Sequence, residues 1–195
     1  KESSDDKYLY SAEIRSVSEN VAKPIRTLSV KIRSPGSMNT GFSQSKVENH
    51  NIVVSIPNVR KPIPLFIVFR ALGFITDKQI IEMCLLNIEK YKSMVDLFIP
   101  SVHESGGIMT QHAALRFIAV FTKGKTIPHV LEILCDYLLP HIGETNYMAK
   151  AYYLGHIVFK LLKVYTKIEE PTNRDNFKYK RIETVGSLMT DLFRE

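Results

Sequence analysis

The stretch YLYSAEIRS, residues 8–16, alternates between apolar and polar side chains. Positions 8, 10, 12 and 14 carry Tyr, Tyr, Ala and Ile, and positions 11, 13 and 15 carry Ser, Glu and Arg. Successive side chains of a β-strand point to opposite faces of a sheet, so this period of two predicts a half-buried strand. The same period returns in TLSVKI, residues 27–32, and in residues 52–56. The sequence therefore predicts a small antiparallel sheet near the N-terminus.

Further along the chain the apolar residues recur at spacings of three and four, which is the period of a helix. This predicts a short buried helix over residues 65–72 that stops at Gly73, and a second helix capped by Thr76 or Asp77. SVHESGG, residues 101–107, is expected to break the chain. Longer helices are expected over residues 110–121, 128–139 and 145–165. The fold class is thus α+β, with the sheet followed by a mostly helical region.

Two further segments differ from this pattern. Residues 34–51, SPGSMNTGFSQSKVENHN, are rich in turn formers and are expected to be a mobile surface loop. A final helix carries an apolar face that we expect to pack against a neighbouring domain. Its residues are Ile182, Val185, Met189, Leu192 and Phe193.

Length and composition limit the class of protein. A chain of 195 residues with 45% hydrophobic content can bury a core and form one domain, with or without an appendage. No apolar run of 18 residues occurs, so no membrane role is expected. The net charge of +6 favours polyanionic partners, although many ordinary proteins are equally basic.

The sequence contains no recognisable catalytic or metal-binding motif. The only two cysteines, Cys84 and Cys135, lie in apolar helical patterns without a C-x-x-C partner, and the six histidines show no ligand spacing. FTKGKT, residues 121–126, follows a predicted helix and not a strand, so it does not predict a phosphate loop. We therefore expect no catalytic residue, no metal site and no cofactor in this chain. A small nuclease or nucleotide-binding enzyme is the weaker alternative.

One polar stretch, EEPTNRDNFKYKR at residues 169–181, combines charge with aromatic rings. Within this stretch, a span of eight residues contains four cations: Arg174, Lys178, Lys180 and Arg181. Phe177 and Tyr179 alternate with them, and Asp175 adds an acceptor that can face a base or a neighbouring Arg. Cations suit a phosphate backbone and rings suit a base or sugar. The alternative is a solvated basic loop that caps the helix over residues 145–165.

Three sequence blocks resemble one protein family. RDNFKYKRIETVGSLMTDLF, residues 174–193, is similar to the D-R-D-x-x-G-x-K-R and x-x-x-x-G-x-L-L-x-x-L-F signature of the second-largest, beta-like subunit of multisubunit DNA-dependent RNA polymerases. IPNVRKPIPLFIVFRALGFITDKQII, residues 56–81, resembles the family's I-P-x-x-x-x-x-I-P-x-x-x-x-F-R-A-L-G-x-x-x-D-x-x-I segment. LLPHIG and KAYYLGHIVFKLL, residues 138–143 and 150–162, match L-P-H-I and K-A-x-x-L-G-x-x-x-x-x-L-L. The blocks follow the family's order.

The resemblance implies a domain assignment and a role. Residues 1–173 would form the lobe domain, and residues 174–195 would return to the adjoining protrusion domain. The lobe is a non-catalytic part of DNA-directed RNA polymerase, a nucleotidyltransferase, and forms one side of the DNA cleft. Its expected partners are downstream DNA and the non-template strand, other polymerase subunits, especially the largest, and initiation factors. The family places Mg and Zn elsewhere in the complex.

The resemblance also implies site residues and a location. Matched position by position, Asp175, Lys180 and Arg181 are expected to contact DNA, and Lys178, Tyr179 and Arg174 are further candidates. The location implied is the nucleus, or the cytoplasm or virion if the chain comes from a large DNA virus.

Three positions depart from the family motif. Its first Asp is Asn173, its usual His is Asn176 and its Gly is Lys178. Replacing Gly by Lys removes easy access to a positive φ, so a different backbone turn is expected there. A protein-interaction module with no direct nucleic-acid role is the alternative function.

Overall fold

The computed structural model describes residues 7–18, 23–34, 50–173, 175–180, 182 and 184–194. For Tyr179, Asp191 and Arg194 it describes the backbone alone. The loop predicted at residues 34–51 therefore lies, except for its ends, outside the described residues, and its predicted mobility stays a prediction.

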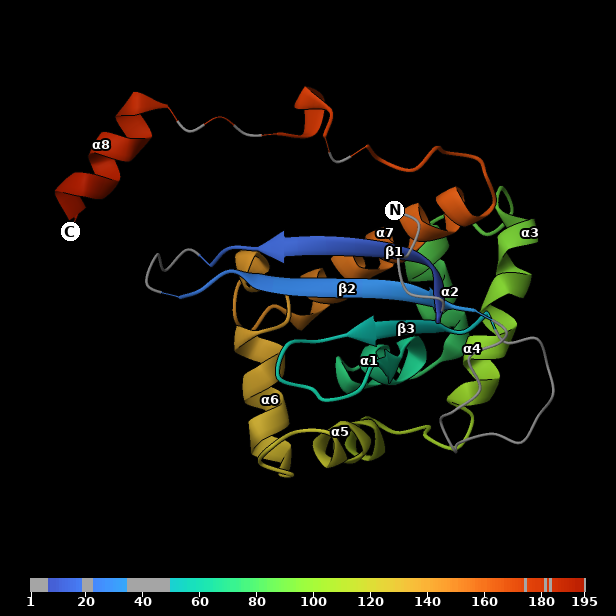
Figure 1. The fold of residues 1–195 in the computed structure, drawn as a ribbon. Coiled ribbons are helices and arrows are strands. Elements are labelled where there is room, and N and C mark those ends of the chain that lie inside the picture. Colours follow the sequence, from blue (N-terminus) through green and yellow to red (C-terminus); the bar gives the residue numbers. More distant parts are fainter. Residues whose placement is uncertain are drawn as a thin grey trace.

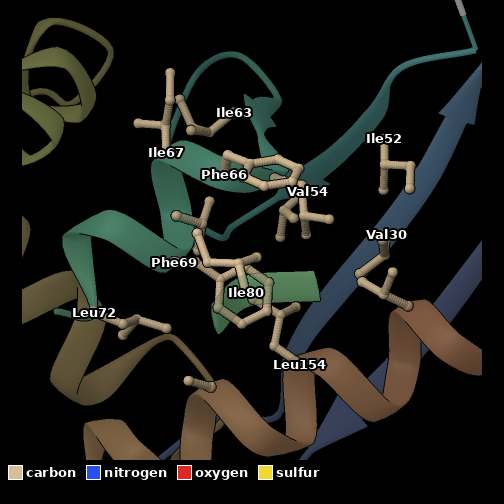
Figure 2. Close-up of a cluster of buried hydrophobic side chains, with 14 of the residues drawn as sticks. Val30, Ile52, Val54, Ile63, Phe66, Ile67, Phe69, Leu72, Ile80 and Leu154 are labelled. Atoms are coloured by element: carbon tan, nitrogen blue, oxygen red, sulfur yellow. The ribbon is translucent and has the colours of Figure 1, made fainter. Parts of the chain in front are cut away.

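The N-terminal sheet is confirmed. It contains four antiparallel strands in the order β1-β2-β3-β4. The strands are β1 (Tyr8–Ser16), β2 (Arg26–Arg33), β3 (Ile52–Ser55) and β4 (Ile63–Pro64). The register places Ala12 beside Val30, Val30 beside Val54 and Val54 beside Ile63. This row of apolar residues crosses the whole sheet. Figure 1 shows helices against one face of the sheet, and Figure 2 shows Val30, Val54 and Ile63 of the row in the buried cluster.

The chain passes directly from β4 into α1 (Leu65–Ala71), a helix whose residues are all buried. Gly73 ends it, as predicted, with a φ of 106°. The N–H of Phe74 donates to the carbonyl of Phe69 at 3.0 Å, and the N–H of Gly73 donates to the carbonyl of Arg70 at 3.1 Å. These two bonds define a Schellman motif, in which glycine supplies the left-handed residue. The FRALG block thus encodes a helix and its stop.

The remaining helices follow in sequence order. They are α2 (Asp77–Leu85), α3 (Lys92–Val95), α4 (Ile99–Glu104), α5 (Gln111–Val120), α6 (Ile127–Asp136), α7 (Tyr147–Tyr165) and α8 (Val185–Arg194). Short 3-10 helices lie at η1 (Asp96–Phe98), η2 (Pro140–Ile142) and η3 (Phe177–Tyr179). The mostly helical region after the sheet is confirmed, and with it the α+β fold class.

The helix boundaries at α4 and at the end of α6 differ from the expectation. The break predicted from residue 101 begins only at Ser105. Ser101 and Ser105 are buried at α4, and the hydroxyl groups of both form hydrogen bonds there. Ser101 Oγ accepts from the N–H of Ile52 at 2.9 Å, and Ser105 Oγ donates to the carbonyl of Ser101 at 3.1 Å. The helix predicted to continue to residue 139 ends at Asp136, and Leu139 has a left-handed backbone with a φ of 48°.

One hydrophobic core joins the sheet to the helices. Figure 2 shows Phe66 and Phe69 of α1 between Val54 of the sheet and the helices behind it. Ile80 of α2 and Leu154 of α7 complete this contact, and all five side chains have no exposed surface. The close approach of α2 and α7 requires Gly155, since a Cβ there would lie 2.8 Å from the carbonyl oxygen of Met83.

Two cations are fully buried within this body. Lys150 Nζ donates to the carbonyls of Leu134 at 2.8 Å, Cys135 at 2.7 Å and Glu144 at 3.0 Å. The first two carbonyls belong to the last turn of α6, so the ammonium stabilises the end of that helix. Burial lowers the pKa of Lys150. The basic residue that opens the KAYYLG block therefore has a structural partner inside the fold.

Arg70 is the second buried cation. Its guanidinium donates to the carbonyls of Ser105 and Ile108 and forms an ion pair with Asp77. The bond to Ser105 measures 2.8 Å. Because a guanidinium offers five donors in a fixed plane, one side chain can join α1, the N-terminus of α2 and the turn after α4.

The cysteines are both free: Cys84 is buried, and burial raises the pKa of its thiol. Cys135 is only half-buried, with its Sγ 2.9 Å from the hydroxyl of Tyr147. Among the described residues, no helix has the length and apolar character that a membrane crossing requires.

Candidate nucleic-acid interface

The segment after α7 begins at a fixed point. Lys167 takes a left-handed backbone with a φ of 59°, and the N–H of Glu169 donates back to the carbonyl of Lys163 at 3.2 Å. The Glu169 carboxylate also pairs with the ammonium groups of Lys163 at 2.7 Å and Lys160 at 3.2 Å. Hydrogen bonds from Lys163 and then Lys160 lower the pKa of Glu169. The chain therefore leaves α7 in a defined direction (Figure 1).

Two asparagines then turn the chain. Asn173 Oδ1 accepts from the N–H of Asp175 at 3.0 Å, and Asn176 Oδ1 accepts from the N–H of Lys178 at 3.0 Å. Bonds from an Asn side chain to a backbone N–H two residues later are typical turn-forming contacts. The second bond caps η3. Both asparagines depart from the family motif, and both act here on the local backbone.

The turn η3 brings a ring and a cation together. Lys180 Nζ lies 5.4 Å from the centre of the Phe177 ring, and the Lys180 N–H donates to the Phe177 carbonyl at 3.1 Å. Residues three apart lie on the same side of a 3-10 helix, which explains the contact. The Phe177 side chain is 80% exposed. The ring is therefore open to a base or a sugar, with a positive charge beside it.

The predicted site residues are placed as follows. Asp175, Lys178 and Lys180 are exposed on the segment that contains η3. Tyr179 belongs to η3, but its side chain lies outside the described residues, as do Arg174 and Arg181. Lys178, which replaces the glycine of the family motif, lies in η3 and is not among the residues with positive φ. Whether this turn differs from that of relatives with glycine here stays a prediction.

One contributor was missed by sequence reasoning. Glu169 was not among the predicted site residues, yet it pairs with two lysines of α7. The available signal was the spacing of Lys160 and Lys163 on one side of a long helix, which places both ammonium groups toward its C-terminal end.

The chemistry that this segment offers is binding. Two exposed ammonium groups and an open ring can hold a phosphate backbone and stack against a base. Across the described part of the chain, no group of three or more His, Cys, Asp or Glu side chains gathers in a way that could hold a metal ion.

Comparison with known proteins finds similar RNA polymerase subunits. Residues 12–183 match the family model described as RNA polymerase Rpb2, domain 2. The chain is 35% identical over 197 residues to DNA-directed RNA polymerase II subunit 2 of Arabidopsis thaliana, covering 97% of this chain and 16% of that protein. It is 36% identical over 196 residues to the RPB2 subunit of Encephalitozoon cuniculi, covering 96% and 16%.

The similarity extends to archaea. The chain is 31% identical over 156 residues to the DNA-directed RNA polymerase subunit Rpo2 of Sulfolobus acidocaldarius, covering 76% of this chain and 14% of that protein. It therefore spans only about one sixth of the length of the full-length subunits that it matches. The resemblance found in the three sequence blocks is confirmed, and the chain belongs to the second-largest-subunit family of RNA polymerases, as its domain 2, the lobe.

Proposed function

We propose that this chain is a non-catalytic wall of the DNA cleft of a DNA-directed RNA polymerase and contacts downstream DNA and the non-template strand. The observation that carries the proposal is the exposed pair of Lys180 and Phe177 on a segment anchored by Glu169. A mobile lysine would lose conformational entropy on binding, whereas a lysine already lying over a ring loses less. Asp175, Lys178, Tyr179, Arg174 and Arg181 flank this pair in sequence.

The C-terminal helix supports a division of the chain at residue 174. The apolar side chains of α8 are all more than half exposed: Val185, Leu188, Met189, Leu192 and Phe193. Such a face is stable in water only when something covers it. We assign residues 1–173 to the lobe and residues 174–195 to the return toward the adjoining protrusion domain, whose surface covers α8.

The same proposal defines partners. The largest subunit supplies the catalytic aspartates and their Mg, and the zinc sites lie elsewhere in the complex. Other subunits and initiation factors dock on the outer faces of the lobe. The relatives that match include eukaryotic RNA polymerase II subunits, which favours the nucleus, and the cytoplasm or virion would apply to a viral polymerase.

The test uses the assembled polymerase that contains this chain. Lys180→Ala together with Arg181→Ala removes two positive charges from the segment, and we expect the open complex on promoter DNA to dissociate several-fold faster. The matched control is Lys78→Ala with Lys92→Ala, which removes two exposed charges from α2 and α3. If the Lys180 and Arg181 variant and the unmodified polymerase have equal open-complex lifetimes, the proposal that these residues contact DNA is wrong.

The exposed face of α8 also favours a second candidate, a protein-interaction module without a nucleic-acid role. This candidate predicts that the chain captures polymerase subunits but ignores duplex DNA. Parallel capture assays with immobilised subunits and immobilised duplex separate the two functions, because only the cleft-wall function retains the chain on DNA in a salt-sensitive manner.

A further inference from the structure

Two loops that lie far apart in the sequence meet on the surface of the body. Residues 56–62 join β3 to β4, and residues 121–126 join α5 to α6. An isolated antiparallel bridge pairs Val59 with Thr122, and the N–H of Arg60 donates to the carbonyl of Phe121 at 3.0 Å. The two loops therefore hold each other in a fixed register.

This register determines which side chains face water. Thr122 has no exposed surface, and its hydroxyl donates to the carbonyl of Ala119 at 2.8 Å. The residues that follow the bridged pair, Arg60 and Lys123, are both exposed. Exposed lysines follow in both loops. We call the set the basic patch: Arg60, Lys61, Lys123 and Lys125.

The charge of the basic patch is not balanced by carboxylates. In the described ranges, none of its four members forms a salt bridge. Glu132 of α6 contacts His129 of the same helix at 3.1 Å. α6 begins two residues after Lys125, and its N-terminus adds partial positive charge. A polyanion is thus the partner that this surface fits.

The location of the basic patch argues for a polypeptide. Figure 1 shows α5 and the start of α6 on the opposite side of the body from η3 and α8. If DNA lies along the C-terminal segment, as the proposed function requires, then the anion at the basic patch is a different molecule. We propose that the basic patch binds an acidic polypeptide segment of a polymerase subunit or factor in extended conformation.

The spacing of the cations fits such a segment. Arg60 lies opposite Phe121, and Lys123 follows two residues later, a placement that corresponds to about 7–8 Å in a regular antiparallel pair. Carboxylates at alternate positions of an extended peptide are about 6.6 Å apart and lie on one side. The half-buried Phe121 ring, with Lys61 Nζ 5.7 Å from its centre, and the 63% exposed side chain of Val120 offer an apolar flank. An acidic segment with an adjacent apolar residue is the best match.

The experiment measures binding of a fluorescent peptide, in which Glu alternates with Ser around a single Phe, to the 195-residue chain. We expect Arg60→Glu with Lys123→Glu to weaken this binding about tenfold, because two attractive charges become repulsive. Lys78→Glu with Lys92→Glu makes the same change in net charge elsewhere and should leave the affinity within about twofold. Thermal unfolding midpoints show whether each variant keeps the fold.

Duplex DNA serves as the second probe. The inference holds if the charge-reversed patch still binds DNA, while Lys178→Ala with Lys180→Ala still binds the peptide. It is overturned if the patch variant binds the peptide as well as the unmodified chain does. It is equally overturned if the patch variant loses DNA more strongly than peptide, since the basic patch would then hold nucleic acid. If the proposed cleft-wall function is wrong, Lys178→Ala with Lys180→Ala will bind DNA as well as the unmodified chain does. That result leaves the peptide measurements at the basic patch unaffected.

Discussion

Arg70 and Lys150 have no exposed surface, whereas Lys178 and Lys180 are exposed on the segment after α7. The two buried cations donate to backbone carbonyls and hold the ends of helices in place. Lys180 lies over an exposed ring. All four are basic residues in or beside sequence blocks shared with one family, so their chemistry alone does not separate them. Burial does: Arg70 and Lys150 stabilise the body itself, whereas Lys178 and Lys180 are exposed, and we propose that they bind a partner.

The largest expected effect comes from exchanging one cation of each kind for alanine. Arg70→Ala leaves buried carbonyls without donors and Asp77 without its partner, and we expect the free energy of unfolding to fall by about 3–5 kcal/mol. Lys180→Ala should change it by no more than about 0.5 kcal/mol. Urea denaturation measures both. If Arg70→Ala and Lys180→Ala lose similar free energies of unfolding, burial does not separate the cations of the body from those of the C-terminal segment.

A pair of glycines makes the next comparison. Gly155→Ala in α7 places a Cβ 2.8 Å from the backbone of Met83, so α2 and α7 must separate, at a cost of about 1–3 kcal/mol. Gly186→Ala in α8 meets no atom within 4 Å and should favour that helix by about 0.5–1 kcal/mol. Thermal unfolding distinguishes the body from the segment, and helical circular dichroism reports on α8. A neutral Gly155→Ala variant would refute the close packing.

The smallest effect concerns the pH dependence of the body. Burial, and then the charge of Lys150, lower the pKa of His141, which contacts Ser16 Oγ at 2.7 Å. Because the unfolded chain takes up a proton first, stability should fall as the pH drops below about 6.5. Solvent screening keeps this loss well under about 1 kcal/mol. The measurement is the free energy of unfolding at about pH 7 and at about pH 5.5. It should change less with pH in His141→Asn than in the control His112→Asn, which replaces an exposed histidine and keeps His141.

Much of the body could be predicted from the sequence because its elements carry simple periods. β1 to β3 follow an alternation of two, and α1 has an apolar run with a glycine stop. β4 was missed because two residues beside prolines show no period. The continuation of α4 through Ser101 was missed for another reason. Its hydroxyl is buried and satisfied by the N–H of Ile52, a contact between distant residues that no local pattern reveals.

The two proposed binding surfaces could be predicted only in part. Local alternation identified the cations and rings around Phe177, since all of them lie on one short segment. It did not show that Glu169 fixes the start of that segment, or that Lys180 lies over Phe177. The basic patch was invisible to local patterns because the bridge between Val59 and Thr122 joins two separate loops. Charges assembled by tertiary contacts require the fold.

The most direct test of the central claim is the salt dependence of duplex DNA binding by the 195-residue chain. We expect a dissociation constant of about 10⁻⁴ to 10⁻⁶ M at physiological salt. The double variant Lys178→Ala with Lys180→Ala should make the slope of log affinity against log salt shallower by about 1.8. Each phosphate contact that is lost removes about 0.9 from the slope, because the counterions at that phosphate are no longer released on binding. Lys78→Ala with Lys92→Ala should leave the slope unchanged. An identical slope in the first variant and the unmodified chain would contradict the claim that the C-terminal segment holds DNA.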